Sequence, residues 1–306
     1  MSTLVFGHKS PDTDATMSAI VWAWYLTNLR GGDAKPALLG EPNTEAVFVL
    51  KHWGFEKPQI IADVEAGQNV VIVDTNNPAE LPPSINEANI MAIIDHHMLV
   101  GGLKTKTPIN VVMRPLACTA TVMHDIMGDD VARLPREVKG AMLSCIVSDT
   151  LEFRSPTTTD HDRAVAEKLA ADIGVAIPDL AAKMFEAKSD VSAFSDAELL
   201  RMDSKEYSVA GKELRVSVLE TTAPKVVLDR KASLMAAMEG VAREDGADQV
   251  LLFVVDILNE EATLLVPNDL VKQMAEASFG AKVTGDTVVL PGIMSRKKQI
   301  IPALKL

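Results

Sequence analysis

The chain has 306 residues, of which 47% are hydrophobic and 4% aromatic, and its net charge at pH 7 is −12. This length can form two domains with separate cores. The acidic balance argues against a general nucleic-acid binder, because phosphate backbones bind to basic surfaces, and the few aromatic residues leave little for bases to stack on.

A small anionic substrate remains compatible with this charge if basic residues gather locally. The sequence shows neither a signal peptide nor an apolar run near the about 18 residues of a membrane span, so we expect a protein without membrane contact. Its two cysteines, Cys118 and Cys145, lie among apolar or small residues. They predict buried free thiols in a reducing cytoplasm, with a disulfide between them as the less favoured alternative.

The first predicted element is a strand at residues 3–6, and a helix over residues 17–29 follows it. Between them lies the turn Gly7-His8-Lys9-Ser10-Pro11-Asp12-Thr13-Asp14-Ala15. Ligand sites of open α/β sheets form at such carboxyl ends of strands. A simple polar turn in which Asp14 caps the helix is the alternative interpretation.

Apolar strands and helices alternate in the next part of the chain. Strands are predicted at 35–40, 59–61, 69–74 and 89–94, and helices at 43–53, 119–127, 137–147, 160–173 and 178–188. Continuous apolar strands that alternate with helices predict an α/β domain with a parallel sheet and helices on both of its faces.

Small and polar residues at 189–195 interrupt this pattern and predict a linker between a first domain, residues 1–188, and a second domain, residues 196–306. In the second domain, strands are predicted at 206–210, 213–219, 249–257, 262–266 and near 288–289, and helices at 231–244 and 269–279. The second domain is therefore predicted to be a smaller α/β domain.

Acidic residues and histidines follow the apolar elements of the first domain; they are His8, Asp12, Asp14, Asp74, Asp95, His96, His97 and Asp149. An ionised carboxylate at the end of a buried strand is costly unless it is paired or binds a metal ion. Carboxylate and imidazole ligands without thiolate suit manganese, iron, cobalt or zinc. So many ligands favour a two-metal centre, which activates a water molecule for in-line hydrolysis at phosphorus.

The ordered set His8-x3-Asp12-x-Asp14, Asp74, Asp95-His96-His97 and Ser148-Asp149-Thr150 resembles the signature of the DHH phosphoesterase superfamily. Within it, Lys205 and the tail Ser295-Arg296-Lys297-Lys298-Gln299 resemble the manganese-dependent (family II) inorganic pyrophosphatases. The resemblance spans nearly the whole chain, which has no room for the nucleotide-binding insert of the regulatory family members.

The resemblance implies a cytoplasmic homodimer that hydrolyses pyrophosphate to two phosphates with water activated by two Mn²⁺ ions per subunit, with Co²⁺ as a possible replacement. His8 and Asp12 would hold one ion, Asp14, His96 and Asp149 the other, and Asp74 would bridge both. The phosphate oxygens would be bound by His97, Lys205, Arg296 and Lys297. Asp95 would orient a neighbouring histidine from behind.

Charge arithmetic supports a role for the second domain. Four ligand carboxylates nearly cancel two divalent ions, so a polyanionic substrate needs additional positive charge. Lys205, Arg296 and Lys297 can supply it from the second domain, and Mg²⁺ bound to the substrate adds more. Closure across residues 189–195 would then place the active site between the two domains and exclude water.

Two alternatives differ in substrate or in class. A DHH phosphoesterase that acts on polyphosphate, short oligonucleotides or cyclic dinucleotides would keep the metal site; such relatives carry a Gly-Gly-Gly-His-type signature in the second domain, which this sequence lacks. A non-catalytic sensor of phosphate or metal would not need a metal pair that activates water.

Overall fold

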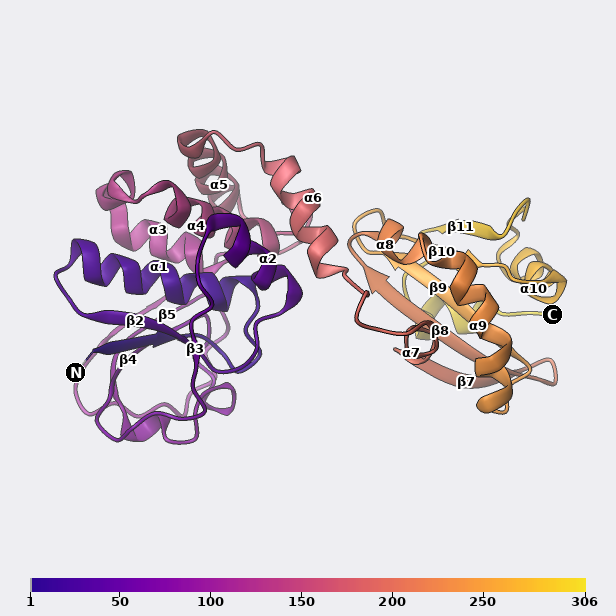
Figure 1. The fold of residues 1–306 in the computed structure, drawn as a ribbon, viewed down its shortest axis with the longest axis horizontal. Coiled ribbons are helices and arrows are strands. Elements are labelled where there is room, and N and C mark those ends of the chain that lie inside the picture. Colours follow the sequence, from indigo (N-terminus) through magenta and orange to yellow (C-terminus); the bar gives the residue numbers. More distant parts are fainter. Residues whose placement is uncertain (1) are drawn as a thin grey trace. The chain divides into compact units, whose positions relative to one another are not determined.

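The computed structural model describes residues 2–306, which form two compact units that divide between Ala187 and Lys188 (Figure 1). Each unit has its own β-sheet and its own hydrophobic core. None of the helices in residues 2–306 is long and apolar enough to cross a lipid bilayer.

The first unit contains a sheet of six strands in the order β3-β2-β1-β4-β5-β6. All neighbouring strands are parallel, which confirms the predicted α/β fold class. The strands are β1 (Thr3–Phe6), β2 (Ala34–Leu38), β3 (Gln59–Ile60), β4 (Asn69–Val73), β5 (Asn89–Asp95) and β6 (Asn110–Met113). The sequence did not indicate β6, because this short edge strand is partly exposed along its whole length and lacks the apolar run of a buried strand.

Six α-helices belong to this unit: α1 (Thr13–Leu29), α2 (Thr44–Trp53), α3 (Thr119–Met127), α4 (Arg136–Asp149), α5 (Asp160–Ile173) and α6 (Ile177–Lys188). Figure 1 shows α1 to α4 on one face of the sheet. The 3₁₀ turns η1 (Pro78–Glu80) and η2 (Ile85–Glu87) and the loops beside them cover the opposite face, where Leu81 and Ile85 pack against Phe6 and Ile72. The prediction of helices on both faces is therefore wrong for this face, because these short turns and loops already bury its apolar side chains.

The strand order reverses between β1 and β4, which are neighbours although β2 and β3 separate them in sequence. In an open parallel sheet, the crevice at this reversal lies outside the carboxyl ends of the strands and is the usual place for a ligand. The turn after β1 contains His8, and Asp74 directly follows β4. The fold therefore brings two of the predicted ligand segments to one edge of the sheet.

Helices α2 and α4 approach closely at Gly140. A Cβ atom at this position would lie 2.5 Å from ring carbons of Trp53, whose indole N–H donates to Ser144 Oγ at 3.0 Å and so holds the ring in place. We expect Gly140→Ala to lower the free energy of unfolding by about 1–3 kcal/mol, the usual effect of overpacking a core. Urea unfolding followed by circular dichroism measures it.

Gly240 provides the matched control for this substitution. It lies within helix α9 (Lys231–Glu244), and no atom lies within 4 Å of a Cβ built there. Gly240→Ala should be neutral or should stabilise by up to about 1 kcal/mol, because alanine is the better helix former. Equal stabilities of the Gly140→Ala variant and the wild-type protein would contradict the predicted clash.

The second unit contains a five-stranded sheet in the order β11-β10-β9-β8-β7. Its strands are β7 (Ser204–Val209), β8 (Lys212–Thr221), β9 (Gln249–Asp256), β10 (Glu261–Leu265) and β11 (Thr287–Pro291). Only β8 and β9 pair in parallel, so this sheet is mixed. Two apolar clusters include buried side chains of the central strand β9, such as Phe253 in one and Leu252 in the other.

The remaining helices of this unit are α7 (Asp196–Arg201), α8 (Pro224–Leu228), α9, α10 (Asp269–Phe279) and α11 (Ile301–Ala303). The segment η4 (Arg296–Ile300) forms one turn of π-helix before α11. Residues 189–195 contribute to this unit, since Val191 packs in its core and Ser189 Oγ accepts a hydrogen bond from Thr221 Oγ1 at 2.7 Å.

Candidate metal centre

The turn after β1 places two carboxylates at the start of α1. Asp12 is the N-cap of this helix, and its Oδ1 atom accepts a hydrogen bond from the Ala15 N–H at 2.9 Å. The interpretation of Asp14 as the cap is therefore wrong. Asp14 lies in the first turn with 1% of its surface exposed, and it accepts hydrogen bonds from Ser18 Oγ at 2.7 Å and from the Thr119 N–H at 2.6 Å.

Asp74 follows β4 with a backbone φ of 58°, in the left-handed region that aspartate tolerates better than most residues. Its buried carboxylate lies between two histidines, with Oδ2 3.5 Å from His8 Nε2 and Oδ1 3.4 Å from His96 Nε2. Thr119 Oγ1 donates to Oδ1 at 3.0 Å. Asp74 therefore occupies the centre of the cluster.

His96 and His97 follow the end of β5. His96 Nδ1 lies 3.1 Å from the Leu116 carbonyl, which can only accept, so Nδ1 carries the hydrogen and Nε2 faces the carboxylates. His97 Nδ1 lies 2.9 Å from Asp95 Oδ1, which also accepts the backbone N–H of both histidines. Asp95 thus contacts the two histidines, and it is absent from the candidate metal groups found among residues 2–306.

Asp149 is the last residue of α4. Three groups of side chains could each hold a metal ion, with their ligand atoms within 4.8 Å of one another: His8, Asp12 and Asp74; Asp14, His96 and Asp149; and Asp74, His96 and His97. The structure therefore brings together all six residues for which the sequence suggested metal binding.

The carboxylates of this cluster strongly perturb one another. Burial and the charge of Asp74 raise the pKa of Asp14 to about 6. Burial, followed by the charges of Asp14 and Asp74, raises the pKa of Asp149 well above its usual value, and Asp149 Oδ2 has no hydrogen-bond partner in residues 2–306. A divalent cation would compensate both the excess negative charge and this unsatisfied oxygen.

The histidines respond in the opposite direction. Burial alone would lower the pKa of His8, but hydrogen bonds and charges from Asp12 and Asp74 raise it to about 10. Burial alone would also lower the pKa of His96, but Asp74 and Asp14 outweigh burial and raise this pKa to about 9. Burial alone would raise the pKa of Asp74, but the hydrogen bonds from His8 and His96 lower it. Protonated histidines therefore take the place of cations in the metal-free protein.

The two cysteines lie outside the candidate ligand groups. Both are free and buried, as the sequence predicted. Burial raises the pKa of Cys145 to about 12 and that of Cys118 well above its usual value, so both remain neutral thiols. The donor set consists of carboxylate oxygens and imidazole nitrogens, which fits manganese, cobalt, iron or zinc.

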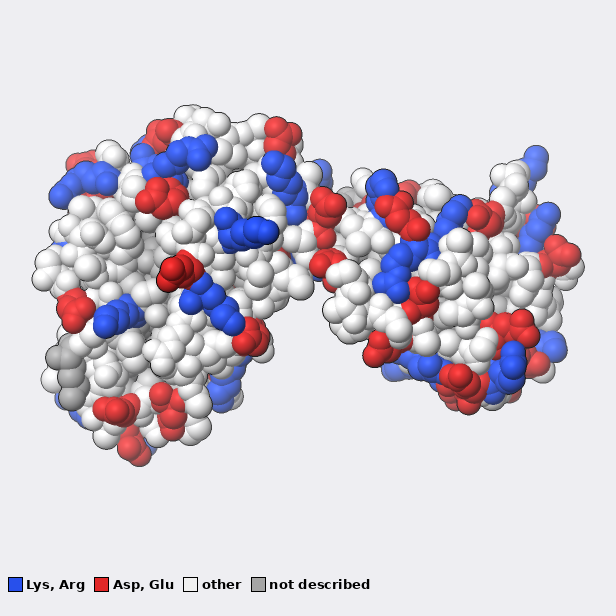
Figure 2. All heavy atoms as spheres, in the orientation of Figure 1, with Lys and Arg blue, Asp and Glu red and all other residues white. Residues whose placement is uncertain are grey.

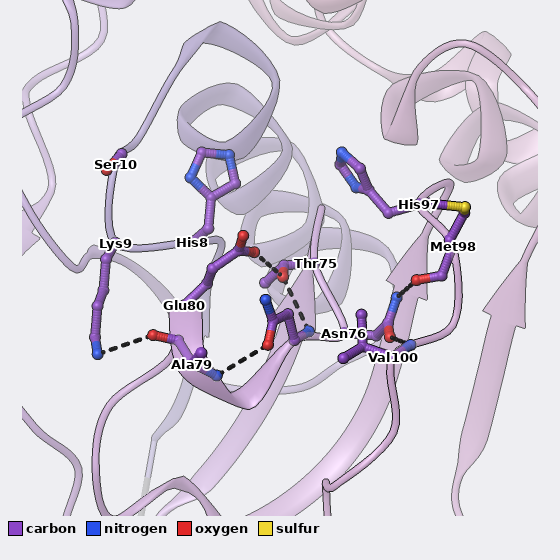
Figure 3. A pocket seen from close by; sticks show the side chains of 11 residues that line it. His8, Lys9, Ser10, Thr75, Asn76, Ala79, Glu80, His97, Met98 and Val100 are labelled. Carbon is purple, nitrogen blue, oxygen red and sulfur yellow. Dashed lines mark hydrogen bonds between the residues drawn. The ribbon is translucent and has the colours of Figure 1, made fainter.

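A pocket of about 590 Å³ opens beside the cluster, as Figure 3 shows. His8 and His97 line it, and Lys9 lies at its margin, where Nζ donates to the Ala79 carbonyl at 3.3 Å. Glu80, on the same wall, accepts a hydrogen bond from Thr75 Oγ1 at 2.7 Å. The candidate ligand His8 can therefore be reached from solvent.

A second pocket, of about 490 Å³, lies in the second unit and is lined by Lys205, Arg296 and Lys297. Lys205 belongs to β7, and the other two begin the π-helical segment η4. Arg296 Nη2 donates to Asp203 Oδ1 at 2.7 Å, and Nη1 donates to the Asp203 carbonyl. The three basic residues predicted in this domain thus share one pocket.

Sequence reasoning missed three residues of these two sites. Thr119 contacts both Asp14 and Asp74, Asp203 holds Arg296, and Glu45 lies behind the metal cluster. Thr119 and Glu45 look like ordinary residues in the first turn of a helix, and Asp203 looks like a solvated acid. Only the position of Asp203 two residues before Lys205 could have drawn attention to it.

Comparison with known proteins shows similarity along the whole chain. The DHH family N-terminal domain matches residues 2–148, and the DHHA2 domain matches residues 182–306. The chain is 41% identical to a Deinococcus radiodurans protein named probable manganese-dependent inorganic pyrophosphatase, over 98% of this chain and 97% of the relative. The manganese-dependent inorganic pyrophosphatase of Bacillus subtilis is 34% identical over the same shares of the two chains. A crystal structure described as a Methanococcus jannaschii family II inorganic pyrophosphatase aligns with a TM-score of 0.61 at 35% identity, covering 98% of this chain and 97% of that chain.

Proposed function

The chain belongs to the family of manganese-dependent inorganic pyrophosphatases, and we propose that it hydrolyses inorganic pyrophosphate to two phosphates. The observation that carries this proposal is the cluster of four carboxylates and two histidines, which come from the ends of β1, β4 and β5, the start of α1 and the end of α4. Such a cluster suits two divalent cations, because four buried or half-buried carboxylates repel one another unless positive charge lies between them.

We assign His8 and Asp12 to one Mn²⁺ ion and Asp14, His96 and Asp149 to the other, with Asp74 shared by both. The observed groups support this assignment, since Asp74 has one oxygen near His8 and the other near His96. Co²⁺ suits the same oxygen and nitrogen donors. When bound, the two ions supply positive charge and lower the pKa of a water molecule that attacks phosphorus.

The residues outside the metal ligands bind the substrate in this proposal. Asp95 fixes the ring of His97 through Nδ1, which leaves Nε2 to contact a phosphate oxygen. The hydrogen bond to Asp95 raises the pKa of His97, so the ring is protonated in a larger fraction of the molecules and carries the positive charge that suits an anion. Lys205, Arg296 and Lys297 supply further positive charge, and Mg²⁺ accompanies the substrate.

In this proposal, one domain binds the metal ions and the other binds the substrate. We propose that residues 1–188 form the metal-binding domain, that residues 196–306 form the substrate-binding domain, and that residues 189–195 link them. The active site would form between the two domains, as the distribution of acidic ligands and basic residues suggests. Closing them over pyrophosphate would exclude bulk water and align the attack.

Phosphate release is the direct test. The protein is stripped with a chelator, reloaded with Mn²⁺ and assayed with Mg²⁺ on pyrophosphate, tripolyphosphate and a dinucleotide. We expect Mn²⁺ to restore rapid hydrolysis of pyrophosphate and little turnover of the other two. A preference for tripolyphosphate or the dinucleotide would agree with a phosphoesterase but contradict pyrophosphate as its substrate. If none of the three were hydrolysed, the proposal that the protein is this enzyme would be wrong.

Nucleic acid is not the partner we propose. Figure 2 shows acidic and basic side chains interspersed on the visible face, and the net charge is −12. Binding to a phosphate backbone relies on an extended basic surface. Little turnover of the dinucleotide in the assay above is the result we expect for a substrate of this kind.

Arg296→Ala should weaken substrate binding more than turnover. Hydrogen bonds from a charged donor contribute about 1.5–3 kcal/mol, and 1.4 kcal/mol corresponds to a factor of ten, so we expect KM for pyrophosphate to rise about 10- to 100-fold. Steady-state kinetics at saturating Mn²⁺ and Mg²⁺ measure this. Lys298→Ala is the matched control, because the exposed Lys298 follows the same basic run but does not line the pocket. An unchanged KM in Arg296→Ala would contradict the assignment.

We also propose that the protein is a cytoplasmic homodimer. Two buried free thiols suit a reducing compartment. Val111, on the edge strand β6, is 52% exposed, and an uncovered sheet edge favours association with a second copy. Light scattering after size exclusion should give twice the chain mass of 32.9 kDa, and a mass of one chain would refute the dimer.

A further inference from the structure

Glu45 is a completely buried carboxylate in the first turn of α2, with 0% of its surface exposed. Its Oε2 atom accepts two hydroxyl hydrogens, from Thr13 Oγ1 at 2.8 Å and from Ser148 Oγ at 2.6 Å. These donors belong to α1 and α4, so one carboxylate oxygen joins three helices.

Both donors are sequence neighbours of candidate metal ligands. Thr13 lies between Asp12 and Asp14, and Ser148 directly precedes Asp149. Glu45 therefore connects the two chain segments whose carboxylates lie in one candidate metal group, together with His96.

The start of α2 is attached to the same turn by further contacts. The N–H of Asn43, the N-cap of α2, donates to the Pro11 carbonyl at 3.0 Å. The backbone at Gly40 packs so closely on the turn that a Cβ atom there would lie 2.5 Å from the Lys9 carbonyl oxygen. The segment that contains Glu45 is thus a rigid support behind residues 8–14.

We propose that Glu45 is a positioning residue that holds Asp14 and Asp149 at metal-binding distance through the hydroxyl groups of Thr13 and Ser148. This inference rests on the proposed metal centre. Asp14 and Asp149 lie in one candidate metal group, and their carboxylates repel each other whenever both are ionised, so a backbone that is fixed from behind keeps the two side chains near each other. Burial of a third carboxylate is costly, and the two hydroxyl donors and the nearby helix N-terminus offset that cost.

Binding of Mn²⁺ tests this proposal without relying on activity. Free Mn²⁺ is measured by electron paramagnetic resonance during titration of the metal-stripped protein. Thr13→Val, which removes the hydroxyl and keeps the side-chain shape, and Ser148→Ala should each raise the dissociation constant about 10- to 100-fold, as is usual for groups that orient metal ligands. Thr13→Ser keeps the hydroxyl and should bind like the wild-type protein.

Ser144→Ala is the matched control on α4. Ser144 is buried one turn before Ser148, and its hydroxyl accepts a hydrogen bond from Trp53 rather than contacting Glu45. Its loss should lower the melting temperature of the metal-free protein and leave Mn²⁺ affinity unchanged. Measuring that melting temperature for every variant separates a positioning role from a purely structural one.

The outcomes separate this inference from the proposed function. If the wild-type protein binds no Mn²⁺, the proposed metal centre itself is wrong. If the wild-type protein binds Mn²⁺ and both Thr13→Val and Ser148→Ala bind it equally well, the metal centre stands and the role of Glu45 is refuted. Should one of these variants fail to fold, the other still decides, because each removes only one of the two hydrogen bonds.

Discussion

Asp74→Asn is expected to abolish stable Mn²⁺ binding and to lower pyrophosphate hydrolysis at least about 1,000-fold. Asp74 belongs to two of the three candidate metal groups and lies between His8 and His96. Metal ions supply several kcal/mol of transition-state stabilisation, of which each 1.4 kcal/mol is a factor of ten. Asparagine suits this position because it tolerates a φ of 58° and keeps the side-chain shape while it removes the charge. Metal content after loading and desalting, measured together with phosphate release, gives the result.

Asp63→Asn is the control for loss of one carboxylate charge in the first unit. Asp63 accepts hydrogen bonds from Ser84 and lies outside the candidate metal groups. We expect this variant to keep the metal content and activity of the wild-type protein. If Asp74→Asn retained the full metal content, Asp74 could not be a shared ligand.

The apparent affinity for Mn²⁺ should rise steeply between pH 6 and pH 8. Burial alone would lower the pKa of His8 and that of His96. In the metal-free protein, hydrogen bonds and charges from neighbouring aspartates instead raise the pKa of His8 to about 10 and that of His96 to about 9. Both rings therefore carry a proton that a metal ion must displace. Each displaced proton contributes about a factor of ten in the association constant per pH unit, so the two histidine protons contribute about 100-fold per unit, and a proton on the buried Asp149 carboxyl, whose pKa is also raised, adds to this.

Proton release during Mn²⁺ loading, followed in weakly buffered solution at pH 7, checks this count independently. His52→Gln is the control, because His52 lies on α2 outside the candidate metal groups and should leave the number of released protons unchanged. An association constant that is independent of pH would contradict the protonated state of His8 and His96.

The sign of the effect on stability follows from the same pKa values. A histidine with a raised pKa stabilises the folded state fully below its unfolded value of about 6.5 and loses this contribution as the pH rises through its folded value. The metal-free protein should therefore lose the contributions of His96 and His8 as the pH passes about 9 and about 10. Urea midpoints of metal-stripped protein at pH 7 and pH 10 measure this loss.

The sequence predicted the buried elements of the fold better than the exposed ones. The apolar runs that became β4 and β5 were visible, since a strand covered on both faces must be apolar at nearly every position. The edge strand β6 and the short helices α7 and α8 were not predicted, because elements this short or this exposed leave no clear periodic pattern.

The sequence alone determined the types of the candidate ligands and placed them at the ends of apolar elements. Carboxylates and imidazoles at the ends of apolar elements already indicated a metal site without thiolate, because these residues at such positions need charge compensation. Only the tertiary structure decided that β1 and β4 are neighbours and that Glu45 joins α1, α2 and α4. These features depend on contacts between segments about 30 to 100 residues apart, and local sequence patterns cannot encode such contacts because they specify only short-range conformation.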